Sequence, residues 1–289
     1  MIESHETEPP GADLPKTSAP RTPEQPAVLS VRGLGFGFAG ETPLFEKLDF
    51  SLKQGEFVSV LAASGIGKTT LFRLLSGLLV PQAGTIAIGE AGDAPAAASK
   101  LGKIGYMPQK DCLMPWRTVL DNAVLGLELG GMPKREARRQ VLKLLPGLGL
   151  DGTANKYPHE LSGGMRQRVS FLRSLLGGGE LLLLDEPFSA LDAMTRVGMQ
   201  EWLLQVWEQH RTTVLFITHD VDEALLLSDR VLVAAQSPIT SLNELAVDLP
   251  RPRSYEFAMD EAFIDLKRRL LGLIGRGARG SSEEAGRLP

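Results

Sequence analysis

The chain has 289 residues and a net charge of −4, because 31 Lys and Arg face 35 Asp and Glu. This slightly acidic balance argues against nucleic acid as a main partner. The single cysteine, Cys112, has no second cysteine with which to form an internal disulfide. No apolar run approaches the ~20 residues that a membrane-spanning helix needs. The sequence therefore predicts one large or two small α/β domains, with any membrane role exerted through a partner.

The two ends of the chain differ in composition from its middle. Residues 1–27 carry many Pro, Glu, Thr and Ala and few large apolar side chains, and they do not resemble a secretory signal. Such a segment cannot bury enough surface to offset its ordering entropy, and residues 275–289 have a similar composition. We expect disordered tails at 1–27 and 275–289 around one folded domain at 28–274.

Apolar periodicity predicts alternating strands and helices along the folded part. Residues 45–52 alternate apolar and polar, whereas residues 181–184 are a continuous Leu run typical of a central strand covered on both faces. Helical spacing follows residue 70, fills much of 119–167 and returns over 257–273. Further strands are expected over 28–31, 57–61, 84–88, 104–107 and 214–217. The predicted fold class is α/β: a parallel sheet covered by helices, with an N-terminal antiparallel β-layer and a helical insertion at about 110–170.

A glycine-rich segment after the 57–61 strand matches the phosphate-loop pattern, in which a glycine and four further residues precede Gly-Lys-Thr/Ser. Its backbone N–H groups would converge on phosphates, with Lys68 bridging the β- and γ-phosphates of ATP and the Thr69 hydroxyl ligating Mg²⁺. The pattern departs at Ala62, which costs about 1 kcal/mol if the position needs positive φ. The alternative is a strand–turn–helix with a chance Gly-Lys-Thr. The candidate nucleotide-binding residues are Ala62, Ala63, Ser64, Gly65, Ile66, Gly67, Lys68, Thr69 and Thr70.

An acidic pair, Asp185 and Glu186, ends the 181–184 strand. A carboxylate at the end of a buried strand can hold Mg²⁺, here through water, so Asp185 takes that role. Glu186 lies one residue further and can reach the water that attacks the γ-phosphate. The alternative is a strand that ends in a solvated acidic turn.

A third motif, Leu-Ser-Gly-Gly-Met-Arg-Gln at 161–167, lies between the phosphate loop and the acidic pair. Ser162 fits a helix N-cap, and the helix that it opens could bind an anion at its N-terminus, although an ordinary Ser-capped helix reads the same way. With all three motifs in this order, the chain resembles the nucleotide-binding subunits of ABC transporters over residues 28–273. The resemblance implies a P-loop NTPase fold and an ATPase that uses ATP and Mg²⁺.

The resemblance also implies roles for single residues. It implies that Ser162, Gly163 and Gly164 face the γ-phosphate held by a second ATPase subunit, and that the 189–192 loop crosses the interface between the two subunits. A pair of identical chains is expected, and a pair of different chains stays open. Glu186 would be the general base and His219 would contact the γ-phosphate. Gln109 would sense Mg²⁺ and the attacking water.

An aromatic residue stacks on adenine in this family, and Phe38 stands at the corresponding place. Phe36 is a rival, and either ring could instead belong to the core. The further partners implied are transmembrane permease subunits and a periplasmic or extracellular substrate-binding protein. The chain would then work at the cytoplasmic face of the cell membrane, bound through the permease.

Within the family, residues 113–122 and 248–253, together with Met165, resemble the nitrate, sulfonate and taurine importer branch, which thiamine-precursor and other organic-anion importers share. The apolar residues 113–116 could dock a short helix of a membrane subunit or fill the core. Nothing in the chain names the cargo.

Two rival functions remain open. Ala62 and the glycine run at 177–179 motivate a nucleotide-binding regulatory or scaffold protein with little turnover. The other rival is an ABC-type ATPase outside transport, in translation or DNA repair. Such proteins usually carry a duplicated cassette or a long coiled-coil insertion, and the sequence contains neither.

Overall fold

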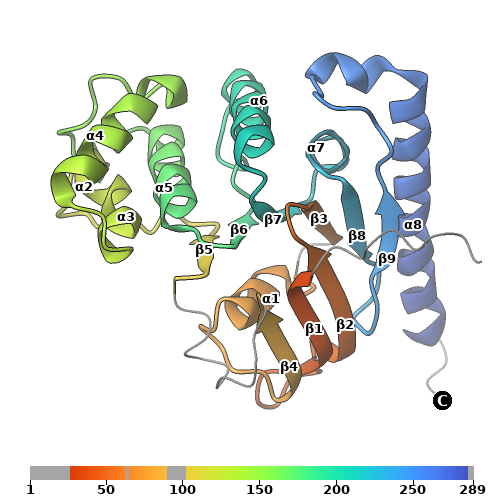
Figure 1. Cartoon of the computed structure of the whole chain (residues 1–289). Helices are drawn as coiled ribbons and strands as arrows, with labels where there is room; N and C mark the ends of the chain where they lie inside the picture. Colours follow the sequence, from red (N-terminus) through yellow and green to blue (C-terminus); the bar gives the residue numbers. More distant parts are fainter. Residues whose placement is uncertain (1–26, 63–64, 90–101, 286–289) are drawn as a thin grey trace, which may run out of the picture.

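The structure, a computed structural model, describes residues 27–62, 65–89 and 102–285, with side chains to residue 275. The expectations for Ala63, Ser64 and the N-terminal tail lie outside these residues, apart from residue 27. The described chain forms a smaller and a larger sheet with helices around them (Figure 1).

The smaller sheet is antiparallel, as predicted. Strand β1 (Ala27–Phe36) lies between β2 (Phe45–Lys53) and β4 (Ala83–Ile88). β1 is longer than the predicted strand because its apolar alternation breaks in the middle. The pairing register with β2 shifts between Val31 and Leu34, and Gly33 adopts φ +59° there. A bulge of this kind interrupts the alternation of apolar and polar residues, so the second half of the strand does not fit a period-two pattern.

The larger sheet has six strands in the order β5-β6-β7-β3-β8-β9. All its pairs are parallel except β8 with β9. Every residue of β6 is buried, which confirms that the Leu run is a central strand. Parallel strands bring the loops at their carboxyl ends to one edge, so the segments after β3, β5, β6 and β7 gather there. The strands are β3 (Phe57–Ala62), β5 (Ile104–Met107), β6 (Leu181–Asp185), β7 (Thr213–Thr218), β8 (Arg230–Ala234) and β9 (Asn243–Ala246).

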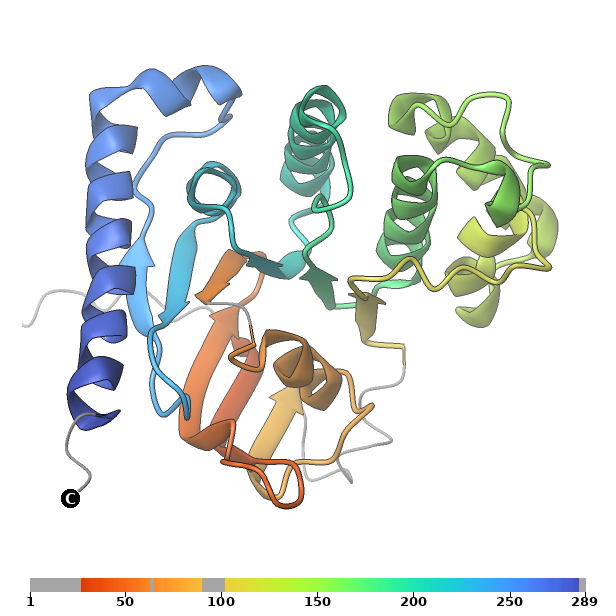
Figure 2. The ribbon, with the colours of Figure 1, turned by 180° about the vertical axis from the view of Figure 1, so that it is seen from behind.

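Helices cover both faces of the larger sheet. On one face, α1 (Lys68–Leu75) shares a hydrophobic core with the smaller sheet. On the other face lie α5 (Gly163–Gly177), α6 (Ala193–His210) and α7 (Val221–Leu227), as the two opposite views show (Figures 1 and 2). This arrangement confirms the predicted fold class.

The helical insertion lies beside β5, at one end of the larger sheet (Figure 2). It packs on α5 at very short range, because a Cβ added to Gly126 would lie 2.2 Å from the Gly177 Cα. The glycine run at 177–179 is therefore explained by backbone-to-backbone packing. The insertion comprises α2 (Val119–Ala123), α3 (Leu125–Leu129), α4 (Lys134–Leu144) and the 3₁₀ turns η1 (Pro146–Leu148) and η2 (Pro158–Glu160).

The C-terminal part corrects one expectation. After the 3₁₀ helix η3 (Tyr255–Met259), helix α8 (Glu261–Ala285) continues through residues that composition assigned to a disordered tail. Phe263, Leu266 and Leu270 form its apolar face and pack in a cluster with residues of α7 and β8. The segment after 271 contains several glycines, but a helix that is already anchored tolerates glycine at roughly 1 kcal/mol each.

Candidate active site

The phosphate loop connects β3 to α1. Gly65 and Gly67 both have positive φ, at 83° and 104°, and Gly67 is the N-cap of α1. The loop lines an open pocket together with Lys68, Thr69, Thr70, Gln109 and Glu186. The backbone therefore presents a turn and a helix N-terminus to the same space, which is the arrangement that binds phosphate.

Ala62 does not carry the strain that its place in the motif suggested. It is the last residue of β3, paired with Ala234 of β8, and it is not among the residues with positive φ. Its carbonyl oxygen accepts a hydrogen bond of 2.8 Å from Lys68 Nζ. The anticipated cost of alanine therefore does not arise.

Lys68 is buried at 9% exposure. Burial lowers the pKa of its ammonium group, while the neighbouring carboxylates Glu186 and Asp185 act in the opposite direction. A desolvated ammonium with carboxylates beside it is prepared to exchange those partners for phosphate oxygens.

Asp185 has the environment expected of a metal-binding carboxylate. It is 1% exposed, and its Oδ2 atom is buried without a hydrogen-bond partner. Burial raises the pKa of Asp185, and a hydrogen bond with the Thr69 side chain partly opposes this rise. No cluster of three or more His, Cys, Asp or Glu capable of holding a metal occurs in the described residues. The donors present fit Mg²⁺, which is commonly held by one or two carboxylates together with phosphates and water.

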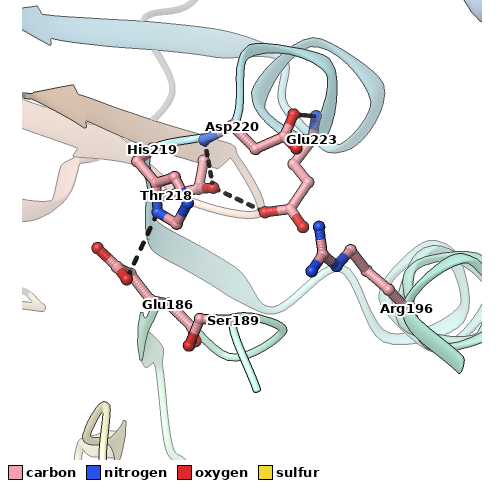
Figure 3. Close-up of a pocket in the computed structure, with 7 residues that line it drawn as sticks. All are labelled: Glu186, Ser189, Arg196, Thr218, His219, Asp220 and Glu223. Carbon is pink, nitrogen blue, oxygen red and sulfur yellow. Dashed lines mark hydrogen bonds and ion pairs between the residues drawn. The ribbon is translucent and has the colours of Figure 1, made fainter. Parts of the chain in front are cut away.

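Glu186 lies at the centre of the site. Its Oε2 atom is 3.2 Å from Gln109 Nε2 and 3.5 Å from His219 Nδ1, and its Oε1 atom is 3.9 Å from Lys68 Nζ. These partners follow β5 and β7 and begin α1, so segments far apart in sequence converge on one carboxylate; Figure 3 shows the contact with His219. Glu186 also adopts φ 48°, and its N–H donates to the Ile217 carbonyl oxygen. A left-handed φ is costly for a non-glycine residue and is often found at active sites.

The Ser-Gly-Gly motif opens α5 at a different place. The Ser162 side chain caps the helix by accepting a hydrogen bond of 3.3 Å from the Met165 N–H, and both Ser162 and Gly163 are exposed. Neither these residues nor Gly164 line the pocket around Lys68. Within one chain, the second anion-binding motif therefore remains apart from the first.

Side chains of α5 connect this helix to the segment after Gln109, a connection that was not predicted from the sequence. The Arg166 side chain forms an ion pair of 2.9 Å with Asp111, and Arg173 donates to the carbonyl oxygens of Asp111 and Cys112. Two arginines about one and three turns into a helix gave no signal of their own, because a basic residue on a helix is usually solvated. These contacts join the segment that follows Gln109 to α5.

The two candidate aromatic residues differ in burial. Phe36 is 8% exposed and belongs to the core around the smaller sheet, whereas Phe38 is 42% exposed and contacts Phe36 edge to face at 5.2 Å. Phe36 is therefore a core residue. Stacking of Phe38 on adenine stays a prediction.

Comparisons with known proteins agree with this geometry. Residues 45–189 match the model of the family described as ABC transporter. The chain is 41% identical over 249 residues to the formylaminopyrimidine import ATP-binding protein ThiZ of Halalkalibacterium halodurans, covering 86% of this chain and 96% of that protein. It is 44% identical over 225 residues to the aliphatic sulfonates import ATP-binding protein SsuB 1 of Rhodococcus jostii, covering 78% of this chain and 85% of that protein.

A solved structure shows the same fold. It is the ATP-binding cassette MJ0796, dimeric in a post-hydrolysis state and bound to ADP and phosphate, with a TM-score of 0.66 and 26% sequence identity. The match covers 77% of this chain and 100% of that one. Among the described residues, no helix has both the length and the apolar content to cross a membrane. The chain belongs to the ABC transporter family, as one of its ATP-hydrolysing, ATP-binding subunits.

Proposed function

We propose that this chain drives an ABC importer, coupling ATP binding and hydrolysis to the uptake of a small organic or inorganic anion, such as a sulfonate, nitrate or taurine, through a membrane permease. The observation that carries the proposal is the convergence of Lys68, Gln109 and His219 on Glu186. The relatives named as importers support the direction of transport.

Each residue of the site has a role that follows from its chemistry. Lys68 and the loop N–H groups bind the β- and γ-phosphates, while Thr69, Asp185 and Gln109 are the residues that would hold Mg²⁺. Bound Mg²⁺ would neutralise phosphate charge. Glu186 accepts a proton from the attacking water, whose oxygen forms a bond to the γ-phosphorus as the bond to ADP breaks. His219 orients the transferred group, so catalysis is mainly positioning and charge stabilisation.

Two copies of the chain form the working unit in this proposal. The exposed N-terminus of α5 offers an anion site that its own phosphate loop does not use. Ser162, Gly163 and Gly164 of one copy therefore contact the triphosphate held by Lys68 of the other. ATP then closes the pair and hydrolysis reopens it.

The permease binds close to Gln109. Leu113 packs against the core of the helical insertion, but Trp116 is 74% exposed, so core filling explains only part of the 113–116 segment. An exposed indole in the segment that follows Gln109 suits a short helix from a membrane subunit. A substrate-binding protein outside the membrane completes the system, and this chain lies at the cytoplasmic face.

The ATP site does not show which small anion is transported. The relatives' names cover aliphatic sulfonates and a formylaminopyrimidine, which differ in charge and shape. The binding protein and permease select the cargo, whereas this chain supplies the energy.

The test is reconstitution of the chain with its permease and binding protein in proteoliposomes, with uptake measured for a panel of sulfonates, nitrate, taurine and formylaminopyrimidine. We expect ATP-dependent uptake of one class, abolished by Lys68→Ala. ATP binding without turnover in the full complex would instead support the regulatory or scaffold role. The two sequence features that motivated that role have structural explanations: Ala62 ends a strand without positive φ, and the glycine run packs closely against neighbouring backbone.

A further inference from the structure

Among the residues drawn in Figure 3, Glu223 is a buried carboxylate on α7, four residues after His219. Glu223 is 8% exposed, and its side chain accepts hydrogen bonds of 2.7 Å from Thr218 Oγ1 and 2.9 Å from Gln200 Nε2. The Arg196 guanidinium extends from α6 toward this carboxylate (Figure 3). A buried carboxylate with these partners is a fixed anchor rather than a solvated charge.

His219 has few restraints of its own. Its side chain is 63% exposed, and it contacts Glu186 at 3.5 Å. The restraint comes from the residues on either side. Thr218 donates to Glu223 and accepts a hydrogen bond of 3.0 Å from the Asp220 N–H, and Asp220 Oδ1 accepts from the Glu223 N–H at 3.1 Å. Glu223 is therefore connected to the backbone both before and after His219.

The same carboxylate reaches the segment that follows Glu186. Gln200 and Arg196 belong to α6, and Arg196 also donates to the Leu191 carbonyl oxygen at 3.2 Å. Ser189, at the start of that segment, donates to the Glu186 carbonyl oxygen at 2.9 Å. The contacts form a closed path from Glu186 through the 189–192 segment, α6 and Glu223 to His219, and back to Glu186.

We propose that Glu223 is a positioning residue, which holds His219 within reach of Glu186 and links its position to that of α6 and the 189–192 segment. The inference rests on the proposed role of His219 in hydrolysis. A movement of the 189–192 segment, as when a second copy docks against it, then reaches the histidine through Gln200 and Arg196. A purely structural Glu223 would serve only to satisfy the buried Thr218 hydroxyl and Gln200 amide.

The experiment is a double-mutant cycle between Glu223→Ala and His219→Ala, with steady-state ATP hydrolysis by the full chain measured over a range of ATP–Mg²⁺ concentrations. We expect Glu223→Ala to lower kcat about tenfold or more with KM changed less than about twofold, because only the alignment of the transition state suffers. In the His219→Ala background the same substitution should change kcat less than about twofold, since a positioning residue has nothing left to position. Glu223→Gln, which keeps one acceptor oxygen, should recover most of the rate.

Two further variants keep the test decisive. Asp222→Asn is the matched control, because Asp222 lies on the same helix but pairs with Lys267 of α8; it should leave kcat unchanged. If Glu223→Ala does not fold, Thr218→Val removes the linking hydroxyl and takes its place in the cycle. Equal losses of kcat in both backgrounds would overturn the inference. An unchanged kcat in His219→Ala alone would instead refute the proposed role of His219, and the inference with it.

Discussion

Replacement of Glu186 by Gln changes charge and basicity at the centre of the site with little change in shape. The amide can still accept the hydrogen bond from Gln109, and the backbone with its positive φ is unaltered. The substitution removes the carboxylate that we propose accepts the proton from water. It also removes a negative charge 3.9 Å from Lys68 Nζ.

Loss of the base should slow hydrolysis, whereas loss of the negative charge should strengthen ATP binding. Loss of a general base lowers the rate by about 10²–10⁴, or about 3–5 kcal/mol of activation free energy. The Lys68–Glu186 attraction at 3.9 Å is about 4 kcal/mol gross at an effective dielectric constant near 20, and desolvation offsets most of it. When ATP binds to the unmodified chain, Lys68 must exchange its contact with Glu186 for one with phosphate, and the negative γ-phosphate must approach the negative carboxylate. The Gln variant avoids both costs. ATP should therefore bind a few-fold more tightly to the variant.

The assay combines single-turnover phosphate release with nucleotide affinity and light scattering on the same preparations. We expect a hydrolysis rate reduced at least a hundredfold, tighter ATP binding, and a stable ATP-bound dimer. Glu244→Gln is the control, because this carboxylate pairs with Arg230 of β8 and is absent from the lining of the phosphate pocket. A Glu186→Gln variant that hydrolyses ATP at the unmodified rate would show that another group accepts the proton.

Three other substitutions test separate parts of the account. Burial raises the pKa of Asp185, so the ionised carboxylate destabilises the fold above its unfolded-state pKa. Asp185→Asn should therefore raise Tm at pH 7, and this gain should disappear below about pH 4. The same substitution should abolish Mg²⁺-dependent turnover. The buried Arg253 guanidinium donates to backbone carbonyl oxygens, which would lose their partner in Arg253→Met. This substitution should lower the free energy of unfolding, measured with urea, by about 3 kcal/mol. Arg268→Met is the control, because Arg268 is exposed, and it should leave the free energy of unfolding unchanged. Trp116→Ala should leave the ATPase of the isolated chain unchanged and reduce its stimulation by the permease; equal rates in both settings would exclude Trp116 from the docking surface.

Much of the site was predictable because its chemistry is local in sequence. A strand, a glycine turn and Lys68 follow one another directly, and the Leu run ends at Asp185. Motif and strand periodicity therefore give both the phosphate loop and the carboxylate that we propose for Mg²⁺. The convergence of Gln109 and His219 on Glu186 depends on strand order, which the residues alone did not give. It was expected only through the family resemblance.

Other features had no local signal. Glu223 reads as an ordinary helical glutamate, and its burial becomes visible only when α6 packs beside α7. The continuation of α8 to Ala285 was missed because composition describes a segment without its anchor at Phe263 and Leu270. The exposure of Trp116 could not be separated from core packing by hydrophobicity.

The central claim is that one copy holds the phosphates and the other supplies the α5 N-terminus. The most direct measurement uses mixed dimers purified through two different tags, with ATPase measured for each pairing. Lys68→Ala removes the phosphate ligand. Gly163→Asp places a negative charge at the anion site, and the structure has room for it, because the nearest atom to an added Cβ is Arg166 Nη2 at 3.8 Å.

The two pairings give opposite results for sites within and between copies. Lys68→Ala paired with Gly163→Asp retains one intact site if the site is shared, and the doubly substituted chain paired with the unmodified chain retains none. We predict ATPase activity in the first pairing and its loss in the second. Activity only in the second pairing would mean that each copy completes its own site, which would contradict the account.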